Sequence, residues 1–352
     1  MDYIAYYNEI AEIQGADPQA TARTRDADGT IPGEARPLLF NVSAEIKNTY
    51  HELGCTLPPL LEGCTVLDLC CGSGRDTYLA AQLVGPAGRV VGVEPVEARL
   101  NIARKYLDQE MRQFGYDAAN VELVHGAPED LSFVPDNSVD VVVSNGTFNL
   151  SPDKDRYLSE VRRVLAEGGE FYFTDVFCDR RIPAALADDM KLRALRLAGA
   201  LYIQDFRRLS VANDFLDPRY LMTWKTPLTD EEQALLPDIA FATITTRLIK
   251  TDLQEDICES YGETVTYKGT LPDFPDYFLF DKDIKFPAGK TCTVCGNVSG
   301  LVMASRYGKV FDLTGDRSVH IGDTHGDHII KCAPDFTGVV DEDDQPIQAS
   351  CC

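Results

Sequence analysis

The chain has 352 residues, and its 33 lysines and arginines against 56 aspartates and glutamates give a formal net charge of −23 at pH 7. This acidic balance argues against nucleic acid or an anionic membrane surface as the main partner, so we expect a small-molecule substrate. No apolar run reaches the roughly 20 residues of a spanning helix, and Met1–Ala5 lacks the start of a signal peptide, so a cytoplasmic location is expected.

Strands and helices are predicted to alternate in the first half of the chain. A short helix is expected near 3–13 and helical spacing over 36–52, so residues 1–50 are predicted to form an N-terminal helical cap. Apolar, β-branched runs then predict strands at 65–69, 89–93, 121–124, 139–144 and 170–176, separated by helices at 76–84, 96–115 and 153–166. Such alternation is typical of a parallel sheet covered on both faces. We therefore predict an α/β, Rossmann-like domain with a parallel-rich sheet at 51–180.

The second half of the chain is less regular. Residues 185–212 look helical and 241–249 strand-like, which predicts substrate-side helices and strands at 181–250. Strands and turns between 250 and 315 predict a smaller α+β C-terminal domain at 251–332. The acidic tail at 333–352 ends in two cysteines and is expected to be disordered.

A glycine-rich loop, Asp68-Leu69-Cys70-Cys71-Gly72-Ser73-Gly74, follows the first predicted strand. Glycines there allow a tight turn and close backbone approach to a ligand. Glu94 ends the second strand about 20 residues later, where a carboxylate can accept both hydroxyls of a ribose. An NAD-dependent dehydrogenase shares this arrangement and has to be weighed.

Three features favour S-adenosylmethionine over NAD. The loop lacks the G-x-G-x-x-G spacing of a pyrophosphate cradle. Pro128 and Glu129 follow the third strand, where a carboxylate or backbone group can bond an adenine amine. Asn145 ends the fourth strand, beside the expected position of a methionine moiety. All these groups are predicted at the carboxyl ends of the strands, where such sheets bind ligands.

Several segments resemble the arsenite S-adenosylmethionine methyltransferase family over roughly residues 45–325. The segments that carry the resemblance are Val66–Leu69, Gly72–Asp76, Gln82–Gly85, Arg104–Leu107, Val142–Asn145, Gly169–Val176, Gly199–Tyr202, Tyr267–Thr270 and Val294–Asn297. The resemblance implies a class I methyltransferase fold. It also implies that the cofactor is held by Gly72, Ser73, Gly74, Glu94, Pro128 and Glu129, with Asp68 near its methionine end. Tyr50, Phe148 and Tyr202 are candidate aromatic walls for the sulfonium.

The family uses cysteine thiolates to hold trivalent arsenic, a soft, trigonal atom whose lone pair attacks the methyl group. Cys55 matches one of these positions. At the two others the expected cysteine is replaced by Gly146 and by Arg196, and an expected N-terminal Asn-Gly-Cys segment is absent. The thiols that could substitute are Cys70, Cys71 and Cys178, although Cys64, Cys70 and Cys71 also suit the role of small buried residues.

Three interpretations remain open. The first is methyl transfer to trivalent arsenic with a rearranged thiol set, with Cys55, Asn145, Gly146 and Arg196 as the site. In the second, the room at Gly146 and the charge of Arg196 suit a carboxylate-bearing thioether, thiol or amine, unless Arg196 lies on a solvated helix face. The third is a non-catalytic protein that binds the cofactor or a thiol-bound metal.

The remaining cysteines do not form a recognisable metal site. Cys292 and Cys295 form one C-x-x-C, whereas a structural zinc site needs four ligands. His320, His325, His328, Cys332 and the terminal Cys351-Cys352 pair are candidate partners, but their spacing matches no zinc motif. No metal is therefore predicted.

Overall fold

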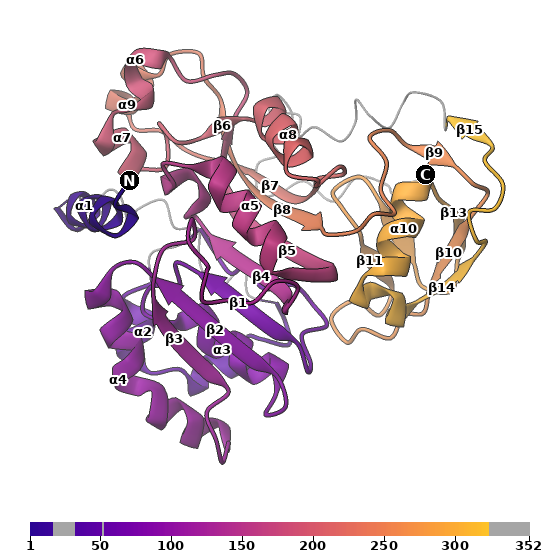
Figure 1. Ribbon diagram of the computed structural model, residues 1–352, viewed down its shortest axis with the longest axis horizontal. Helices are drawn as coiled ribbons and strands as arrows, with labels where there is room; N and C mark the ends of the chain where they lie inside the picture. Colours follow the sequence, from indigo (N-terminus) through magenta and orange to yellow (C-terminus); the bar gives the residue numbers. More distant parts are fainter. Residues whose placement is uncertain (17–31, 51–52, 324–352) are drawn as a thin grey trace.

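A computed structural model describes residues 1–16, 32–50 and 53–323 of the chain. Figure 1 shows a central sheet with helices around it, the N-terminal helix at one side and a smaller β-rich unit at the other. No helix in the described ranges is both long and apolar enough to cross a membrane. The predicted disordered tail at 333–352 lies outside these ranges, as do His325, His328 and Cys332.

The described residues form one large, mostly parallel sheet of eight strands in the order β3-β2-β1-β4-β5-β8-β7, with β6 beside β5. Strands β1 to β5 and β6 pair in parallel, whereas β8 runs antiparallel to both β5 and β7. The predicted α/β fold with a parallel-rich sheet is therefore confirmed. The strands are β1 (Thr65–Leu69), β2 (Arg89–Glu94), β3 (Val121–His125), β4 (Val139–Asn145), β5 (Leu165–Cys178), β6 (Leu201–Tyr202), β7 (Arg219–Lys225) and β8 (Phe241–Ile249).

Helices cover both faces of this sheet, as the alternation of side chains along β1 illustrates. Val66 packs in one apolar cluster with Leu79, whereas Leu67 packs in another with Tyr157. Successive side chains of a strand point to opposite faces, so a strand buried on both sides is mostly apolar. The helices that follow β1, β2 and β4 are α3 (Arg75–Val84), α4 (Glu97–Phe114) and α5 (Lys154–Val164).

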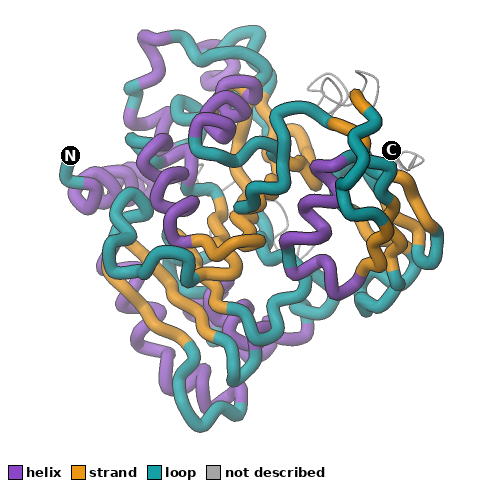
Figure 2. Tube along the Cα trace, turned by 45° about the vertical axis from the view of Figure 1, so that its right-hand side comes forward, coloured by secondary structure: helices purple, strands orange, loops and turns teal. Residues whose placement is uncertain are grey.

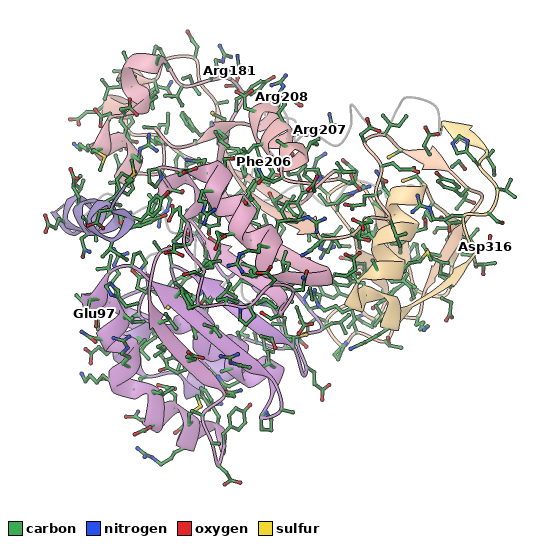
Figure 3. All side chains as sticks on the ribbon, in the orientation of Figure 1. Glu97, Arg181, Phe206, Arg207, Arg208 and Asp316 are labelled. Atoms are coloured by element: carbon green, nitrogen blue, oxygen red, sulfur yellow. The ribbon has the colours of Figure 1, made fainter. Side chains whose placement is uncertain are left out.

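Residues 185–212, which look helical in the sequence, form three short helices instead of a continuous one. They are α6 (Ala184–Ala187), α7 (Met190–Ala194) and α8 (Ile203–Ala212). Arg196 has a left-handed φ of 63°, which a continuing α-helix does not tolerate, and α7 ends just before it. Figure 3 shows Arg181, Arg207 and Arg208 around α8, where Asp205 pairs with Arg181 and Arg208.

The N-terminal segment packs on two parts of the fold. It forms α1 (Tyr3–Ala16), a 3-10 turn (Pro37–Asn41) and α2 (Ala44–Asn48). Helix α1 lies over the carboxyl edge of the sheet, and the elements after it pack against α3 and α4. Tyr7 and Ile10 of α1 pack with Ala127, Leu150 and Ala194, which belong to the loops after β3 and β4 and to α7. The expected helix near 3–13 is therefore present, and it covers the loops that follow the parallel strands.

The C-terminal unit is built around antiparallel strands and one helix, and Figure 2 shows these strands beside the helix. Its aromatic core includes Tyr267, Phe278, Phe286 and Phe311. The helix α10 was not predicted from the sequence. The elements from β8 onward, with α9 before it, are α9 (Asp230–Leu235), β9 (Glu259–Ser260), β10 (Thr264–Tyr267), β11 (Tyr277–Leu279), β12 (Lys285–Pro287), β13 (Thr291–Thr293), α10 (Gly296–Ala304), a 3-10 turn (Arg306–Val310), β14 (Phe311–Thr314) and β15 (Gly322–Asp323).

A buried ion network joins this unit to the large sheet. Glu170 of β5 is fully buried between Arg247 of β8 and Arg306 of the C-terminal unit, and both guanidinium groups pair with its carboxylate. The Tyr307 hydroxyl lies 3.0 Å from Glu170 Oε2 and donates to it. Although burial opposes ionisation, the charges of Arg306 and Arg247 hold the pKa of Glu170 below its ordinary value. The network therefore fixes the C-terminal unit against β5.

Candidate active site

The loop between β1 and α3 presents open backbone at the carboxyl edge of the sheet. Cys70, Gly72 and Gly74 have left-handed φ values of 55°, 59° and 91°. A Cβ at Gly72 would meet no atom within 4 Å, whereas one at Gly74 would lie 3.1 Å from the Cβ of Ala103. Gly74 is therefore needed for packing, and Gly72 leaves open space beside the backbone for a ligand.

Glu94 supports this loop from the end of β2. Its buried carboxylate accepts a hydrogen bond from the Gly72 N–H over 2.8 Å and another from the Val96 N–H over 2.9 Å. Each carboxylate oxygen has a second lone pair, so the group can also accept a ribose hydroxyl. Ser73 is buried and accepts a hydrogen bond from Thr49, which ties the loop to the end of α2.

Asp68 lies on β1, between Gly92 of β2 and Val143 of β4 in the register of the sheet. The side chain is buried, and its Oδ2 accepts a hydrogen bond from Thr77 of α3 over 2.6 Å. The strand order reverses between β1 and β4, which is where open parallel sheets bind their ligands. Asp68 therefore stands beside the expected ligand crevice.

Pro128 and Glu129 are buried in the loop after β3, beneath α1. Glu129 Oε1 accepts hydrogen bonds from the Tyr7 hydroxyl over 2.9 Å and from Ser151. Its Oε2 is buried and has no hydrogen-bond partner among the described residues, and burial raises the pKa of this carboxyl group. An unmatched buried acceptor suits a ligand that brings a donor, such as the amino group of an adenine.

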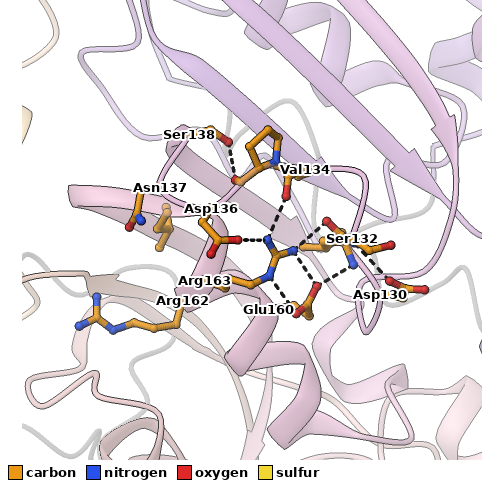
Figure 4. Close-up of polar contacts among 12 residues, drawn as sticks. Asp130, Ser132, Val134, Asp136, Asn137, Ser138, Glu160, Arg162 and Arg163 are labelled. Atoms are coloured by element: carbon orange, nitrogen blue, oxygen red, sulfur yellow. Dashed lines mark hydrogen bonds and ion pairs between the residues drawn. The ribbon is translucent and has the colours of Figure 1, made fainter.

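The segment that carries Pro128 and Glu129 is held in place by Arg163 of α5. Its guanidinium donates to the carbonyls of Leu131 and Val134 over 2.8 and 2.9 Å, and it also pairs with Glu160 and Asp136. Figure 4 shows this fan of contacts around one guanidinium. The loop that follows Glu129 is thereby pinned to α5, so the position of Glu129 does not depend on α1 alone.

Asn145 ends β4 and holds the segment before Cys55. Its Oδ1 accepts a hydrogen bond from the Leu53 N–H over 3.0 Å, and its Nδ2 donates to the Gly54 carbonyl over 2.7 Å. Tyr50 joins the same network, because its hydroxyl accepts from Asn145 Nδ2 over 2.7 Å. The Tyr50 ring lies 3.2 Å from the Arg75 guanidinium, so that ring face is occupied by Arg75.

Cys55 is 6% exposed and borders a cavity of about 220 Å³. The cavity lies between the large sheet and the C-terminal unit. Tyr172 and Met222 of the sheet line one side, and Leu271 and Phe278 of the C-terminal unit line the other. Burial raises the pKa of the Cys55 thiol well above its ordinary value, with Asp76 adding to the rise and Arg75 opposing it. A neutral thiol in a largely apolar cavity suits a soft, uncharged ligand.

Gly146 and Arg196 contact each other directly. Arg196 Nε donates a hydrogen bond to the Gly146 carbonyl over 2.6 Å, and Arg196 is 6% exposed. A Cβ at position 146 would lie 2.7 Å from Arg196 Nε, and Gly146 has a left-handed φ of 69°. The possibility that Arg196 lies on a solvated helix face is therefore wrong, since the residue follows α7 and turns inward.

The other candidate side chains are placed differently from Cys55. Phe148 is fully buried among Tyr157, Phe173 and Phe206, so it packs in the core instead of forming a pocket wall. Cys178 is buried with its thiol toward the Ala200 carbonyl, and burial raises its pKa to about 12. Of the cysteines Cys55, Cys70, Cys71 and Cys178, only Cys55 borders the described cavity. Tyr202 is half-buried and ends β6.

Some site contacts carry no sequence signal. Tyr7 reaches Glu129 from 122 positions earlier, and Asn145 reaches Leu53 and Gly54 across more than 90 positions. Although Asn145 and Glu129 were candidate site residues, Tyr7, Leu53 and Gly54 carry no motif, so composition and periodicity could not pair them. The glycine loop and Glu94, by contrast, were found by their position after successive strands.

Comparison with known proteins agrees with this arrangement. A methyltransferase domain model matches residues 60–225, and an arsenite methyltransferase C-terminal domain model matches residues 261–352. The chain is 41% identical over 320 residues to an arsenite methyltransferase of Aquipseudomonas alcaligenes, covering 90% of this chain and 91% of that protein. It is 33% identical to the arsenite methyltransferase of Mus musculus, covering 88% and 82% of the two chains.

A solved structure shows the same fold. The crystal structure of CrArsM, an arsenic(III) S-adenosylmethionine methyltransferase from Chlamydomonas reinhardtii, superimposes with a TM-score of 0.81 at 40% identity, covering 83% of this chain and 99% of that one. The glycine loop, Glu94 and the unmatched acceptor of Glu129 fit S-adenosylmethionine, whose role is to supply an electrophilic methyl group on a sulfonium. The chain therefore belongs to the arsenite methyltransferase family and is an S-adenosylmethionine-dependent methyltransferase.

Proposed function

We propose that this enzyme methylates a trivalent arsenical that is held by a single protein thiolate, that of Cys55. The observation that carries the proposal is the position of Cys55, which borders a largely apolar cavity and is tied through Gly54 to Asn145 at the end of β4. The two other positions at which the family resemblance expects cysteine hold Gly146 and Arg196, which bond to each other. A trivalent arsenic atom bound to Cys55 therefore needs two further substituents, which Gly146 and Arg196 cannot supply.

Because the protein supplies one thiolate in this proposal, the preferred substrates are those that already carry other substituents on arsenic. A methylated arsenical already carries one carbon substituent, and arsenite bound to external thiols carries sulfur substituents, so both need fewer protein ligands than free arsenite. The cavity beside Cys55, lined by Leu271 and Phe278, offers apolar surface to such substituents. Burial of an apolar substituent contributes roughly 25 cal/mol per Å² removed from water.

In this reaction the protein mainly binds and aligns the arsenical and the methyl donor. The Cys55 thiol replaces a hydroxyl group on arsenic, an As–S bond forms, and the thiol proton leaves with the hydroxide as water. The high pKa of Cys55 is compatible with this exchange because the proton is transferred to the leaving group. Asn145 fixes the backbone before Cys55, and the cavity excludes water from the arsenic lone pair.

The alternative substrate, a carboxylate-bearing organic nucleophile, is not favoured by the contacts. A carboxylate clamp needs the guanidinium fork of Arg196 directed at open space. In the structure Arg196 Nε donates to the Gly146 carbonyl, and the Arg196 charge acts to lower the pKa of buried Asp175. Seven of the described cysteines are free thiols, which suits a reducing compartment and supports our inference that the enzyme acts in the cytoplasm.

The test compares Cys55→Ser with Cys64→Ser, since both cysteines are buried but Cys64 precedes β1 at the opposite edge of the sheet. Methyl transfer from labelled S-adenosylmethionine is measured with methylarsenite, and with arsenite in the presence and absence of an external dithiol. We expect Cys55→Ser to lower kcat/KM for methylarsenite about 100-fold or more, while Cys64→Ser leaves it unchanged. Cofactor affinity, measured by calorimetry, should be unchanged in both.

Retained activity in Cys55→Ser would contradict the proposal and direct attention to Cys70, Cys71 and Cys178. Equal kcat/KM values for free arsenite and methylarsenite would contradict the single-thiolate part alone. Transfer to carboxylated thioethers with no transfer to any arsenical would replace arsenic as the acceptor and leave the methyltransferase assignment intact.

A further inference from the structure

Two cysteines of the C-terminal unit lie side by side, outside the site described above. The sulfurs of Cys258 and Cys295 are 3.6 Å apart and in hydrogen-bond contact, although the residues are 37 positions apart in the sequence. Cys258 directly precedes β9, and Cys295 is the residue before α10. The proposed methyl transfer at Cys55 makes no use of this pair.

The spacing of the two sulfurs suits one shared soft atom. Two bonds of about 2.3 Å to sulfur at an angle near 100° place the sulfurs about 3.5 Å apart. The observed separation of 3.6 Å is close to that span, so both sulfurs can bind one atom with little rearrangement. Among the described residues there is no group of three or more Cys, His, Asp or Glu placed to hold a metal ion, and structural zinc takes four such ligands. A trivalent atom that brings its own third substituent fits two thiols better.

The surroundings of the pair favour one thiolate beside one thiol. Hydrogen bonding from Cys258 is the main cause that holds the pKa of Cys295 below its usual range, and burial opposes it. The charge of Arg219 and the Val298 N–H in the first turn of α10 act on this pKa in the same direction as Cys258, whereas the charge of Asp217 acts against them. One ionised sulfur is the form that attacks an electrophilic atom most readily.

We propose that Cys258 and Cys295 form a second binding site, which captures a trivalent arsenical carrying two hydroxyl groups as a dithiolate. Two As–O bonds break and two As–S bonds form. One hydroxide leaves as water with the proton of the remaining thiol, and the other leaves as water with a proton taken up from the solvent. Arsenic stays trivalent throughout, so no oxidant or reductant takes part. The proposal takes its ligand class from the family and goes beyond methyl transfer at Cys55.

The pair lies near a part of the fold that can open locally. Cys258 and Cys295 are 8% and 4% exposed, and β9 is held to β15 by a ladder of only two residue pairs. Both strands lie toward the outer end of the C-terminal unit in Figure 1. Short peripheral ladders open at low free-energy cost, and such opening gives a small ligand access to the two sulfurs.

The test counts bound arsenic on the full-length chain with Cys55 replaced by serine, so that the proposed substrate thiol is absent. Phenylarsine oxide is the probe, a phosphine keeps the thiols reduced, and excess glutathione removes the arsenical from single thiols. Native mass spectrometry gives the number of arsenicals per chain. In this background Cys258→Ser, Cys295→Ser and the double variant should each lose the same single equivalent. The matched control, Cys64→Ser, should lose none.

This shared loss distinguishes a common arsenic atom from two independent adducts, which would lose two equivalents in the double variant. Unchanged counts in both single variants, or a loss in only one of them, would overturn the proposal.

A second measurement covers variants that fold poorly. Phenylarsine oxide should raise the Tm of Cys55→Ser, and the rise should be smaller when Cys258 or Cys295 is replaced by alanine. An equal rise would also overturn it. Neither readout depends on methyl transfer, so failure of the proposed function leaves this test valid.

Discussion

Arg196 Nε donates a hydrogen bond to the carbonyl oxygen of Gly146 over 2.6 Å, and the two residues stand where the family resemblance expects two arsenic-binding cysteines. The replacements are therefore coupled in space. A side chain at 146 would meet the Arg196 guanidinium at 2.7 Å, so the arginine would have to move, and the left-handed φ at 146 adds strain for any residue but glycine. The two residues that stand in place of the expected cysteines therefore pack against each other.

The first prediction tests this coupling. Gly146→Cys should lower the free energy of unfolding by about 3 kcal/mol, because it adds both a left-handed φ penalty and a clash with Arg196. Adding Arg196→Cys should return at least about 1 kcal/mol of that loss. Urea unfolding of the parent, the two single variants and the double variant measures these free energies. Strictly additive changes would show that the two positions are independent. The double variant should also gain activity on free arsenite relative to methylarsenite.

The second prediction concerns the cofactor loop. Glu94→Gln replaces one carboxylate oxygen by a donor, which disrupts acceptance from either the Gly72 or the Val96 N–H and removes a charged partner for a ribose hydroxyl. The Kd for S-adenosylmethionine should rise about 10-fold or more. Calorimetry measures it, with Glu97→Gln, an exposed glutamate at the start of α4, as the control. Equal Kd values for the two variants would remove Glu94 from the cofactor site.

The third prediction concerns the joint between the large sheet and the C-terminal unit. Glu170→Gln would leave the buried charges of Arg247 and Arg306 without their carboxylate, and the free energy of unfolding should fall by about 3 kcal/mol or more. Glu122→Gln, which breaks an exposed pair with Arg89, should cost less than about 1 kcal/mol. Denaturant unfolding compares the two. Similar small losses would mean that the network adds little to stability.

The fourth prediction is a pH dependence. Burial raises the pKa of Asp175 from 3.8 to about 6. Between these values the folded chain holds a proton that the unfolded chain has released, so the Asp175 contribution to the free energy of unfolding falls as the pH rises. Asp175→Asn removes this titration, and its stability relative to the parent should rise by about 2 to 3 kcal/mol from pH 3.5 to 6.5. Exposed Asp276→Asn is the control, and parallel curves for all three proteins would contradict the prediction.

The strands of the parallel sheet could be predicted closely because each is a short apolar run bounded by turns. The predicted strand at 65–69 has the same bounds as β1, and that at 241–249 the same bounds as β8. The helix α10 escaped notice because it is buried on nearly every side and contains two glycines, so it lacks an alternation of apolar and polar faces. The break near Arg196 also carries no signal, since arginine rarely adopts a left-handed φ.

Some residues of the candidate site could likewise be predicted from the sequence, and others could not. Gly72, Gly74 and Glu94 were found from their positions after successive strands, which the topology of a parallel sheet brings together. The bonds from Arg196 to Gly146, from Tyr7 to Glu129 and between Cys258 and Cys295 join distant segments. Such pairs depend on how helices and loops pack on the sheet, which one sequence does not specify. The predicted domain boundaries and the roles of all the predicted site residues, the glycine loop and Glu94 included, stay predictions.

The contact between positions 146 and 196 also constrains the order in which an ancestor with two cysteines could have changed. Arginine at 196 beside a side chain at 146 would place the guanidinium within 3 Å of a carbon atom, so the arginine would have to move from the position in which it bonds the 146 carbonyl. Glycine at 146 beside cysteine at 196 meets no such obstacle. We therefore expect the loss of the thiol at 146 to be the change that makes room for arginine at 196, and a side chain regained at 146 alone to disturb that arginine. Relatives that carry the two mixed states should then pair glycine with cysteine more often than cysteine with arginine.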